Sequence, residues 1–190
     1  MHAAAAHEKV EEYQEAIDNV RKDFPNCWFR GITDKKYDLE PSIYRKPYKP
    51  ELEATFLGQF KSQAPPFLKD LPINDWNWLF LMQHYGVPTR LMDWTSHPLV
   101  ALTFALKNLE TDADNKDLIV YCLNPEKLNK KINVINHDEY NPIPFVGKEQ
   151  EHVFGVGQTK TNNLPIAIIG PLNNDRIVVQ KGTFTLFPFK

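Results

Sequence analysis

The sequence predicts an α+β fold in a single domain, with N-terminal helices packed on a small, mainly antiparallel sheet. Apolar residues recur at helical spacing near the start of the chain: Val10, Tyr13, Ile17, Val20 and Phe24. Segments rich in β-branched and aromatic residues come late, as in "LPIAIIG" and "DRIVVQKGTFTLFPF". Helices first and strands late, with strands too few for a doubly wound sheet, favour α+β. The 190 residues are enough for one core, and no interior linker is visible.

The N-terminal amphipathic helix is expected to end before Pro25 and to belong to the same domain as the rest. The next segment, "CWFRGIT", predicts a short strand over residues 27–33. Side chains alternate along a strand, so Trp28 and Arg30 should share one face. The proline-rich, polar residues 35–50 predict a long loop.

Two more helices are predicted before the middle of the chain. Pro50 is suited to the first turn of a helix and should open the second one. Asn74 or Asp75 should cap the third, which runs to Tyr85. Gly86 is placed to end that helix in a left-handed turn.

The second half starts with a fourth helix near Pro98. It is apolar almost all round, so we expect it to be buried against a sheet or other helices. "DLIVYCLN", residues 117–124, predicts a strand that ends before Pro125. The polar residues 126–163 predict weak strands and loops, and the final segments predict strands.

The amino-acid composition excludes few classes of function. The formal net charge is −2, so no global basic field favours duplex nucleic acid, although a local groove stays possible. The two cysteines, Cys27 and Cys122, form no CxxC motif, and zinc is therefore not expected. With no apolar run of membrane-spanning length and no visible signal peptide, we expect a cytoplasmic protein without membrane association.

Arg30 is the first candidate for chemistry. A guanidinium on an aromatic strand needs a partner, which is either a buried carboxylate such as Asp93 or an anionic ligand held in two-point contact. Gly31 follows directly. Its missing side chain would let a ligand lie on the backbone, or would serve a bulge or close packing.

The second candidate is the polar stretch between the third and fourth helices. Thr95 or Ser96 can cap the fourth helix, whose N-terminus also suits an anion. Arg90 and Asp93, three residues apart in an extended loop, pair with each other or face a ligand. His84 is either a helix-end hydrogen-bonder or a base.

Two further groups lie late in the chain. Arg176, Val178 and Gln180 would share a strand face, and Lys181-Gly182 predicts a bulge or tight bend. The polar Gln180 would then make a cross-strand hydrogen bond or contact a ligand. Glu149 and Glu151 have the spacing of paired carboxylates for acid–base work, or of a solvated strand face.

Four motifs resemble those of the FRG domain family, named for its Phe/Tyr-Arg-Gly motif: "WFRG", "LEPSIYR", "QHYGVPTRLMDWTSHPLVALTFA" and "RIVVQKGTFTLFP". The resemblance runs from Cys27 to Pro188 and suggests an FRG domain over residues 27–190. The motif order is similar to that of ADP-ribosyltransferases. The resemblance therefore implies their fold, with a split sheet, and NAD as cofactor.

The resemblance also implies roles for single residues. Arg30 would clamp the phosphate or ribose of NAD, and Gly31 would present its backbone to nicotinamide. Asp93 would line the same pocket. The remaining cofactor-binding positions are His84, Tyr85, Arg90, Trp94, Thr95 and Ser96, where Tyr85 or Trp94 would stack on a ring. Gln180 would take the third catalytic position, after Arg30 and Asp93.

Gln180 departs from the pattern, because such transferases place a glutamate there to stabilise the positive charge as nicotinamide leaves. Asp93, Glu149 or Glu151 would then supply the carboxylate, or a C-terminal part that follows in other family members would, or the domain binds without turnover. The expected function is transfer of ADP-ribose to RNA, DNA or protein by a bacterial toxin or anti-phage effector, with an antitoxin as a possible partner. The alternatives are a nucleotide- or RNA-binding module and an NAD hydrolase.

Overall fold

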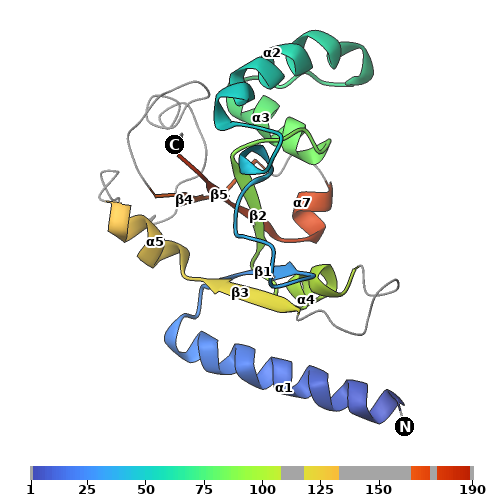
Figure 1. The fold of residues 1–190 in the computed structure, drawn as a ribbon, viewed down its shortest axis with the longest axis vertical. Coiled ribbons are helices and arrows are strands. Elements are labelled where there is room, and N and C mark those ends of the chain that lie inside the picture. Colours follow the sequence, from blue (N-terminus) through green and yellow to red (C-terminus); the bar gives the residue numbers. More distant parts are fainter. Residues whose placement is uncertain (1, 108–117, 133–163, 172–174, 189–190) are drawn as a thin grey trace.

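The computed structural model describes residues 2–107, 118–132, 164–171 and 175–188 (Figure 1). Helices and strands alternate irregularly along the chain. In order they are α1 (His2–Asp23), β1 (Trp28–Ile32), η1 (Ser42–Tyr44), η2 (Pro50–Leu52), α2 (Glu53–Gln63), η3 (Pro65–Phe67), α3 (Asp75–His84), β2 (Leu91–Thr95), α4 (Pro98–Leu106), β3 (Ile119–Leu123), α5 (Pro125–Ile132), β4 (Ile166–Ile168), α7 (Asp175–Val179) and β5 (Gly182–Leu186).

The five strands form one antiparallel sheet in the order β3-β1-β2-β5-β4, which confirms a mixed helix-and-sheet domain. The neighbouring strands β1 and β2 pair at one position only. β1 is in register with β3 along its whole length, and β2 with β5, whereas β1 and β2 meet only at Phe29 and Thr95. The sheet is thus two halves joined at one point, with β1 and β3 lying below the other three strands in Figure 1.

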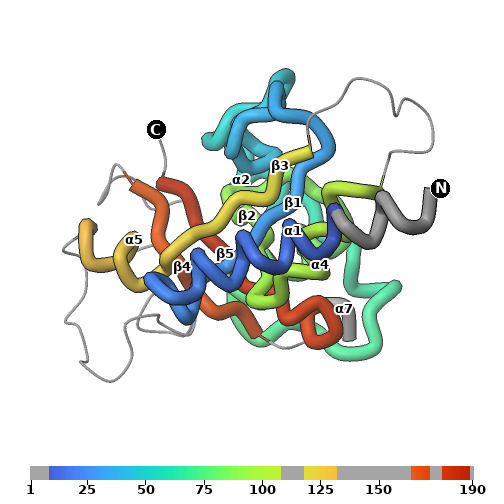
Figure 2. The backbone as a smooth tube through the Cα atoms, turned by 90° about the horizontal axis from the view of Figure 1, so that it is seen from below, coloured from blue at the N-terminus to red at the C-terminus, as the bar shows by residue number. Residues whose placement is uncertain are grey.

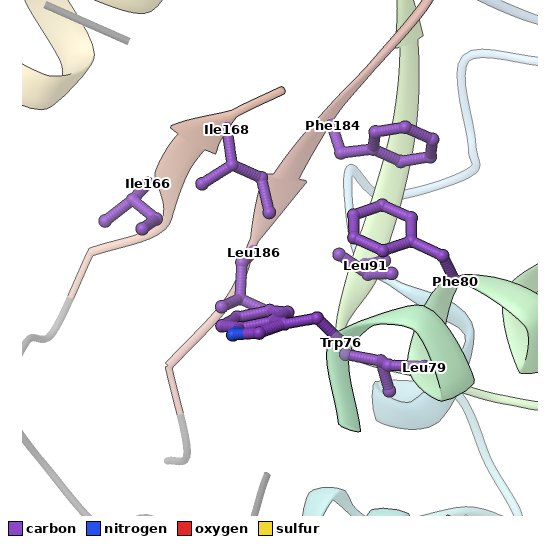
Figure 3. Packing of buried hydrophobic residues seen from close by; sticks show 8 residues of the cluster. All are labelled: Trp76, Leu79, Phe80, Leu91, Ile166, Ile168, Phe184 and Leu186. Atoms are coloured by element: carbon purple, nitrogen blue, oxygen red, sulfur yellow. The ribbon is translucent and has the colours of Figure 1, made fainter. Parts of the chain in front are cut away.

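Helix α3 covers one face of the β2-β5-β4 half. Its side chains Trp76, Leu79 and Phe80 pack on strand residues, as Figure 3 shows. The strand residues of this cluster are Leu91, Ile166, Ile168, Phe184 and Leu186. The Phe80 and Phe184 rings meet edge to face, with centroids 4.7 Å apart. This packing holds the C-terminal end of α3 beside the opening between the two halves of the sheet.

Helices α1 and α4 belong to the β3-β1 half. Ile17 of α1, Phe29 of β1 and Ala101 of α4 share a buried cluster with Cys27. Figure 2, seen from below, shows α1 crossing this half of the molecule. No helix within the described ranges is long and apolar enough to cross a membrane.

Several local predictions are confirmed. Helix α1 ends at Asp23, just before Pro25. Asn74 caps α3 by accepting a 2.8 Å hydrogen bond from the Asn77 backbone N–H. Gly86 has φ 78°, the left-handed value that a glycine at a helix end adopts without strain.

Helix α4 packs against the sheet, as expected, but only one of its sides is buried. Only Ala101 and Ala105 are buried, while Leu99 and Leu106 are 41% and 43% exposed. The helix packs on β1 through its small residues. Its apolar composition therefore reflects close packing on one side and not burial on every side.

Two segments expected to be strands or loops are helical. Residues 125–132 form α5, which Asn124 caps and Pro125 opens, and Leu128 packs on the sheet. Residues 175–179 form α7, so Val178 and Gln180 do not share a strand face with Arg176. The chain turns at Lys181, where φ is 46°, and β5 begins only at Gly182, which confirms the predicted tight bend.

Candidate functional site

A cavity of about 280 Å³ lies where β1 and β2 separate. Both halves of the sheet and the ends of three helices contribute to its wall. The lining residues are Phe29, Arg30, Gly31, Phe80, Gln83, His84, Asp93, Trp94, Thr95, Ala101, Phe104, Ile177, Gln180, Gly182 and Phe184. The opening exists because the strand ladder between β1 and β2 stops after a single pair of residues.

Arg30 reaches across this opening. Its Nη1 donates a hydrogen bond to the backbone carbonyl of Asp93, on a strand that its own strand does not pair with at this point. Burial lowers the pKa of the Arg30 guanidinium, while the nearby Asp93 carboxylate raises it and Arg45 lowers it again. The guanidinium still carries its charge at neutral pH, because arginine is not deprotonated in proteins. Arg30 therefore supplies a fixed cation to the cavity.

The Asp93 carboxylate is oriented by Gln83, at the end of α3. Gln83 Nε2 donates to Asp93 Oδ2 at 2.9 Å. The fully buried Thr89 hydroxyl donates to Gln83 Oε1 at 2.5 Å, so the amide can only present its N–H groups to Asp93. Among the described lining residues, Asp93 is the one carboxylate. The cavity thus contains one positioned cation and one positioned anion.

Thr95 and Gln180 close the inner end of the cavity. The Thr95 hydroxyl donates to the Gln180 carbonyl at 2.6 Å and accepts from the backbone N–H of His97 at 3.0 Å. The first bond ties the end of β2 to the segment before β5, and the second fixes the turn into α4. His97, and not Thr95 or Ser96, is the N-cap residue of α4, and it makes no side-chain capping bond.

Gly31 is explained by close packing. A Cβ atom at this position would lie 1.8 Å from the Ala101 carbonyl oxygen and 2.8 Å from the Ala105 backbone nitrogen. No side chain fits between β1 and α4. Gly31 therefore brings α4 against the strand, and its backbone also lines the cavity.

Arg90 was predicted to bind the cofactor or to pair with Asp93, and it lies outside the cavity wall. Its side chain is 2% exposed, and its Nε donates to Glu53 Oε2 at 2.7 Å. Its backbone N–H donates to Glu53 Oε1 at 2.7 Å, and Nη1 donates to the Phe187 carbonyl at 2.9 Å. A guanidinium this deep needs such partners, so Arg90 anchors α2 to the sheet.

Trp94 is one of the lining residues of the cavity, but its indole packs into the core, and Tyr85 lies outside the cavity wall. The indole of Trp94 lies in a buried cluster with Trp28 and Met92, and its Nε1 donates to Thr185 Oγ1 at 3.0 Å. Consecutive strand residues point to opposite faces, so Asp93 and Trp94 cannot both direct side chains to the same side. Tyr85 is 61% exposed, and it is not part of the cavity wall.

Of the remaining predicted site residues, some line the cavity and others lie outside it. His84 lines the cavity beside Gln83, whereas Ser96 lines a separate cavity next to α1. Glu149 and Glu151 lie outside the described residues. The sequence reasoning missed Gln83 and the apolar wall formed by Phe80, Phe104 and Ile177. A signal for Gln83 was present, since it precedes His84 at the polar end of α3. No cluster of His, Cys, Asp or Glu that suits a metal ion occurs within the described ranges.

Residues 25–114 match the family model of the FRG domain. The match includes the "WFRG", "LEPSIYR" and central motifs, and the final motif at residues 176–188 lies beyond it. No curated protein and no solved structure matches the chain. The match confirms the family resemblance of the motifs, and it includes Arg30, Gln83, Asp93 and Thr95 of the cavity. Residues 25–114 of this chain thus match the FRG domain family.

Proposed function

We propose that this FRG domain binds the nicotinamide-ribose end of NAD in the cavity between β1 and β2 and transfers ADP-ribose to a macromolecule. One observation carries the proposal: Arg30 of β1, Asp93 and Thr95 of β2, and Gln180 before β5 come from three separate segments and line one cavity in the opening of the sheet. This is the order of strand positions that the resemblance to ADP-ribosyltransferases implies. The ADP-ribosyltransferase-like fold itself is part of the proposal.

The size of the cavity limits which part of NAD it holds. Its volume of about 280 Å³ is close to the lower end of ligand pockets, roughly 300 Å³. One heterocycle and one ribose fit such a volume better than a whole dinucleotide. The phosphates and adenosine would extend out past Arg30, whose forked N–H groups suit two-point contact with phosphate oxygens.

Asp93 would take the part expected of a glutamate at position 180. The bond that breaks joins C1′ of the ribose to the nicotinamide nitrogen, and nicotinamide leaves with the electron pair. The sugar passes through a state like an oxocarbenium ion, whose positive charge a fixed carboxylate stabilises. The acceptor nucleophile then bonds to C1′ and loses a proton. Gln180 is neutral and cannot supply that charge, whereas Asp93 is a carboxylate held by Gln83.

The neutral Gln180 also supports the alternatives to transfer. A nucleotide- or RNA-binding module needs the Arg30 cation and no leaving-group chemistry. An NAD hydrolase needs the same cavity with water as the acceptor. If the acceptor is a macromolecule, the domain would act as a bacterial toxin or anti-phage effector, and an antitoxin protein could inhibit it.

The test uses NAD labelled separately in the adenylate phosphate and in nicotinamide, with RNA, DNA and protein as acceptors. Wild type should release nicotinamide and transfer the phosphate label to one acceptor class. Arg30→Ala should weaken NAD binding, and Asp93→Asn should lower the rate by about 10²-fold or more while NAD still binds. Lys130→Ala is the control, because Lys130 is an exposed cation on α5 that lies outside the cavity wall.

The possible results separate the three functions. Nicotinamide release without transfer, with free ADP-ribose as product, would identify a hydrolase. Binding of NAD or RNA without release of nicotinamide would identify the binding module. Absence of both binding and release in wild type would refute the proposal that this cavity is an NAD site.

A further inference from the structure

A second cavity, of about 490 Å³, lies between α1 and the start of α4. It borders the first one. Its wall is formed by Tyr13, Gln14, Ile17, Asp18, Arg21, Ser96, His97, Pro98, Leu99 and Lys181. Neither the FRG resemblance nor the proposed reaction uses this cavity, and Ser96 is the one residue of the predicted cofactor set that it contains.

Positive charge predominates in its wall. Arg21 and Lys181 are cations, and Asp18 is the one carboxylate among the lining residues. The Arg21 guanidinium lies 5.5 Å from the centre of the buried Phe29 ring, which restricts where the charge can sit. Lys181 reaches the same cavity from the tight turn before β5. Two cations from elements far apart in the sequence thus face one space.

His97 adds a hydrogen-bonding group without a partner. Its Nδ1 atom is buried and makes no hydrogen bond, although its ring belongs to the wall of this cavity. A buried polar atom without a partner in a native fold calls for an explanation, and a ligand oxygen is one. His97 also caps α4 without a side-chain bond, so the positive end of the helix dipole adds to the field here.

The aromatic part of the wall is also fixed. The Tyr13 hydroxyl donates to the Pro98 carbonyl at 2.8 Å, which holds the ring between α1 and α4. Burial raises the pKa of Tyr13 to about 12, so it stays neutral at physiological pH. A cationic groove next to an aromatic ring is the combination by which proteins bind single-stranded nucleic acid.

The two cavities share one wall. Thr95 lines the first cavity, while the next residues, Ser96 and His97, line the second. In the same way, Gln180 lines the first and Lys181 the second. The backbone N–H of Ser96 donates to the Lys181 carbonyl at 3.1 Å, which fixes the two segments together. A group bound in the second cavity therefore lies against the same two chain segments that line the first.

We propose that the second cavity binds a backbone phosphate of a single-stranded nucleic acid, and that this strand is the acceptor of ADP-ribose. Arg21, Lys181 and His97 would share the phosphate oxygens, and the ring of Tyr13 would offer a surface for a base. The acceptor part rests on the proposed function, whereas strand binding does not require it. Because the chain carries a net charge of −2, this local site and not a general basic surface would hold the strand.

The test compares binding of a fluorescein-labelled 12-nucleotide strand, measured by anisotropy, between wild type and Arg21→Gln/Lys181→Asn. Asparagine tolerates the positive φ of position 181, so the turn is kept while the charge is lost. Lys22→Gln is the matched control, because Lys22 bonds to Asn19 on the same helix and lies outside the cavity wall. The double variant should bind at least about 10-fold more weakly, and the magnitude of the slope of log K against log salt should fall by about 0.7, the value for one phosphate contact on a single strand. The control should bind like wild type.

Labelled NAD then tests the acceptor. The double variant should keep an unchanged KM for NAD but lose transfer to the strand, so that any nicotinamide it releases is matched by free ADP-ribose formed with water as the acceptor. His97→Asn, compared by thermal melting with wild type, serves as a second variant if the double variant unfolds. Unchanged strand affinity in both variants, a raised KM for NAD, or transfer to protein alone would each overturn the inference. If the double variant binds the strand more weakly and wild type does not consume NAD, the phosphate site is supported and the proposed transferase activity is refuted.

Discussion

Replacing Gly31 with alanine should separate α4 from β1 and thereby damage both the fold and the cavity. The new Cβ would lie 1.8 Å from the Ala101 carbonyl oxygen, whereas ordinary contacts begin at 3.4 Å. The helix would have to move by roughly 1.5 Å, since the obstacle is backbone and no side-chain rotation removes it. Overpacking usually costs about 1–3 kcal/mol, and we expect a cost of about 3 kcal/mol here.

Urea denaturation measures this cost. With a slope of about 2 kcal/mol per molar urea, the midpoint of Gly31→Ala should fall by about 1.5 M. Gly58→Ala is the matched control, because a Cβ at position 58 on the exposed side of α2 meets nothing within 4 Å. That control should gain roughly 0.5–1 kcal/mol, the usual difference between glycine and alanine inside a helix. A Gly31→Ala protein as stable as wild type would refute the packing of α4 on β1.

Three further predictions address the site and its support. Gln83→Glu keeps an acceptor for the Thr89 hydroxyl but places a second carboxylate against Asp93. NAD turnover should therefore fall at least about 10-fold with little change in melting temperature. Turnover equal to that of wild type would show that the contact between Gln83 and Asp93 is dispensable. Glu53→Gln leaves the buried Arg90 without its counter-ion and should cost roughly 3–5 kcal/mol in urea denaturation, whereas a loss below 1 kcal/mol would contradict that pairing. The pKa of Tyr13 is about 12 in the folded protein against 10.0 for the free side chain, so the free energy of unfolding should fall as pH rises from about 10 to 12. The melting temperature of Tyr13→Phe should decline less steeply than that of wild type across this range.

Local signals predicted much of the first half of the fold. The spacing of apolar residues in α1, the Asn74 cap and the left-handed Gly86 depend on residues within one or two turns of each other. Such signals act before any tertiary contact forms. They failed over residues 175–179, where β-branched residues form α7, because Ile177 packs against the core formed by α3 and the β2-β5-β4 half of the sheet.

The candidate site was predicted in part. Arg30, Asp93 and Gln180 were identified by residue type, and they do line one cavity. The partner of Asp93 could not be chosen from the sequence, because Arg90 is nearer along the chain than Gln83. In the structure Arg90 pairs with Glu53, 37 residues away, and the Asp93 carboxylate accepts a hydrogen bond from Gln83 instead. Charge alone therefore suggested the wrong ion pair.

The sequence by itself determined the end of α1, the cap of α3 and the turn at Gly86, and it identified residues that could carry chemistry. Only the tertiary structure decided which of those residues meet. The Arg30 side chain reaches the Asp93 carbonyl across 63 residues of chain, and Trp94 turns into the core because its neighbour faces the cavity. The physical reason is that capping and periodicity act over a few residues, whereas a cavity depends on how the two halves of the sheet separate beyond the single pair Phe29 and Thr95. That separation results from packing α3, α4 and α1 around the strands.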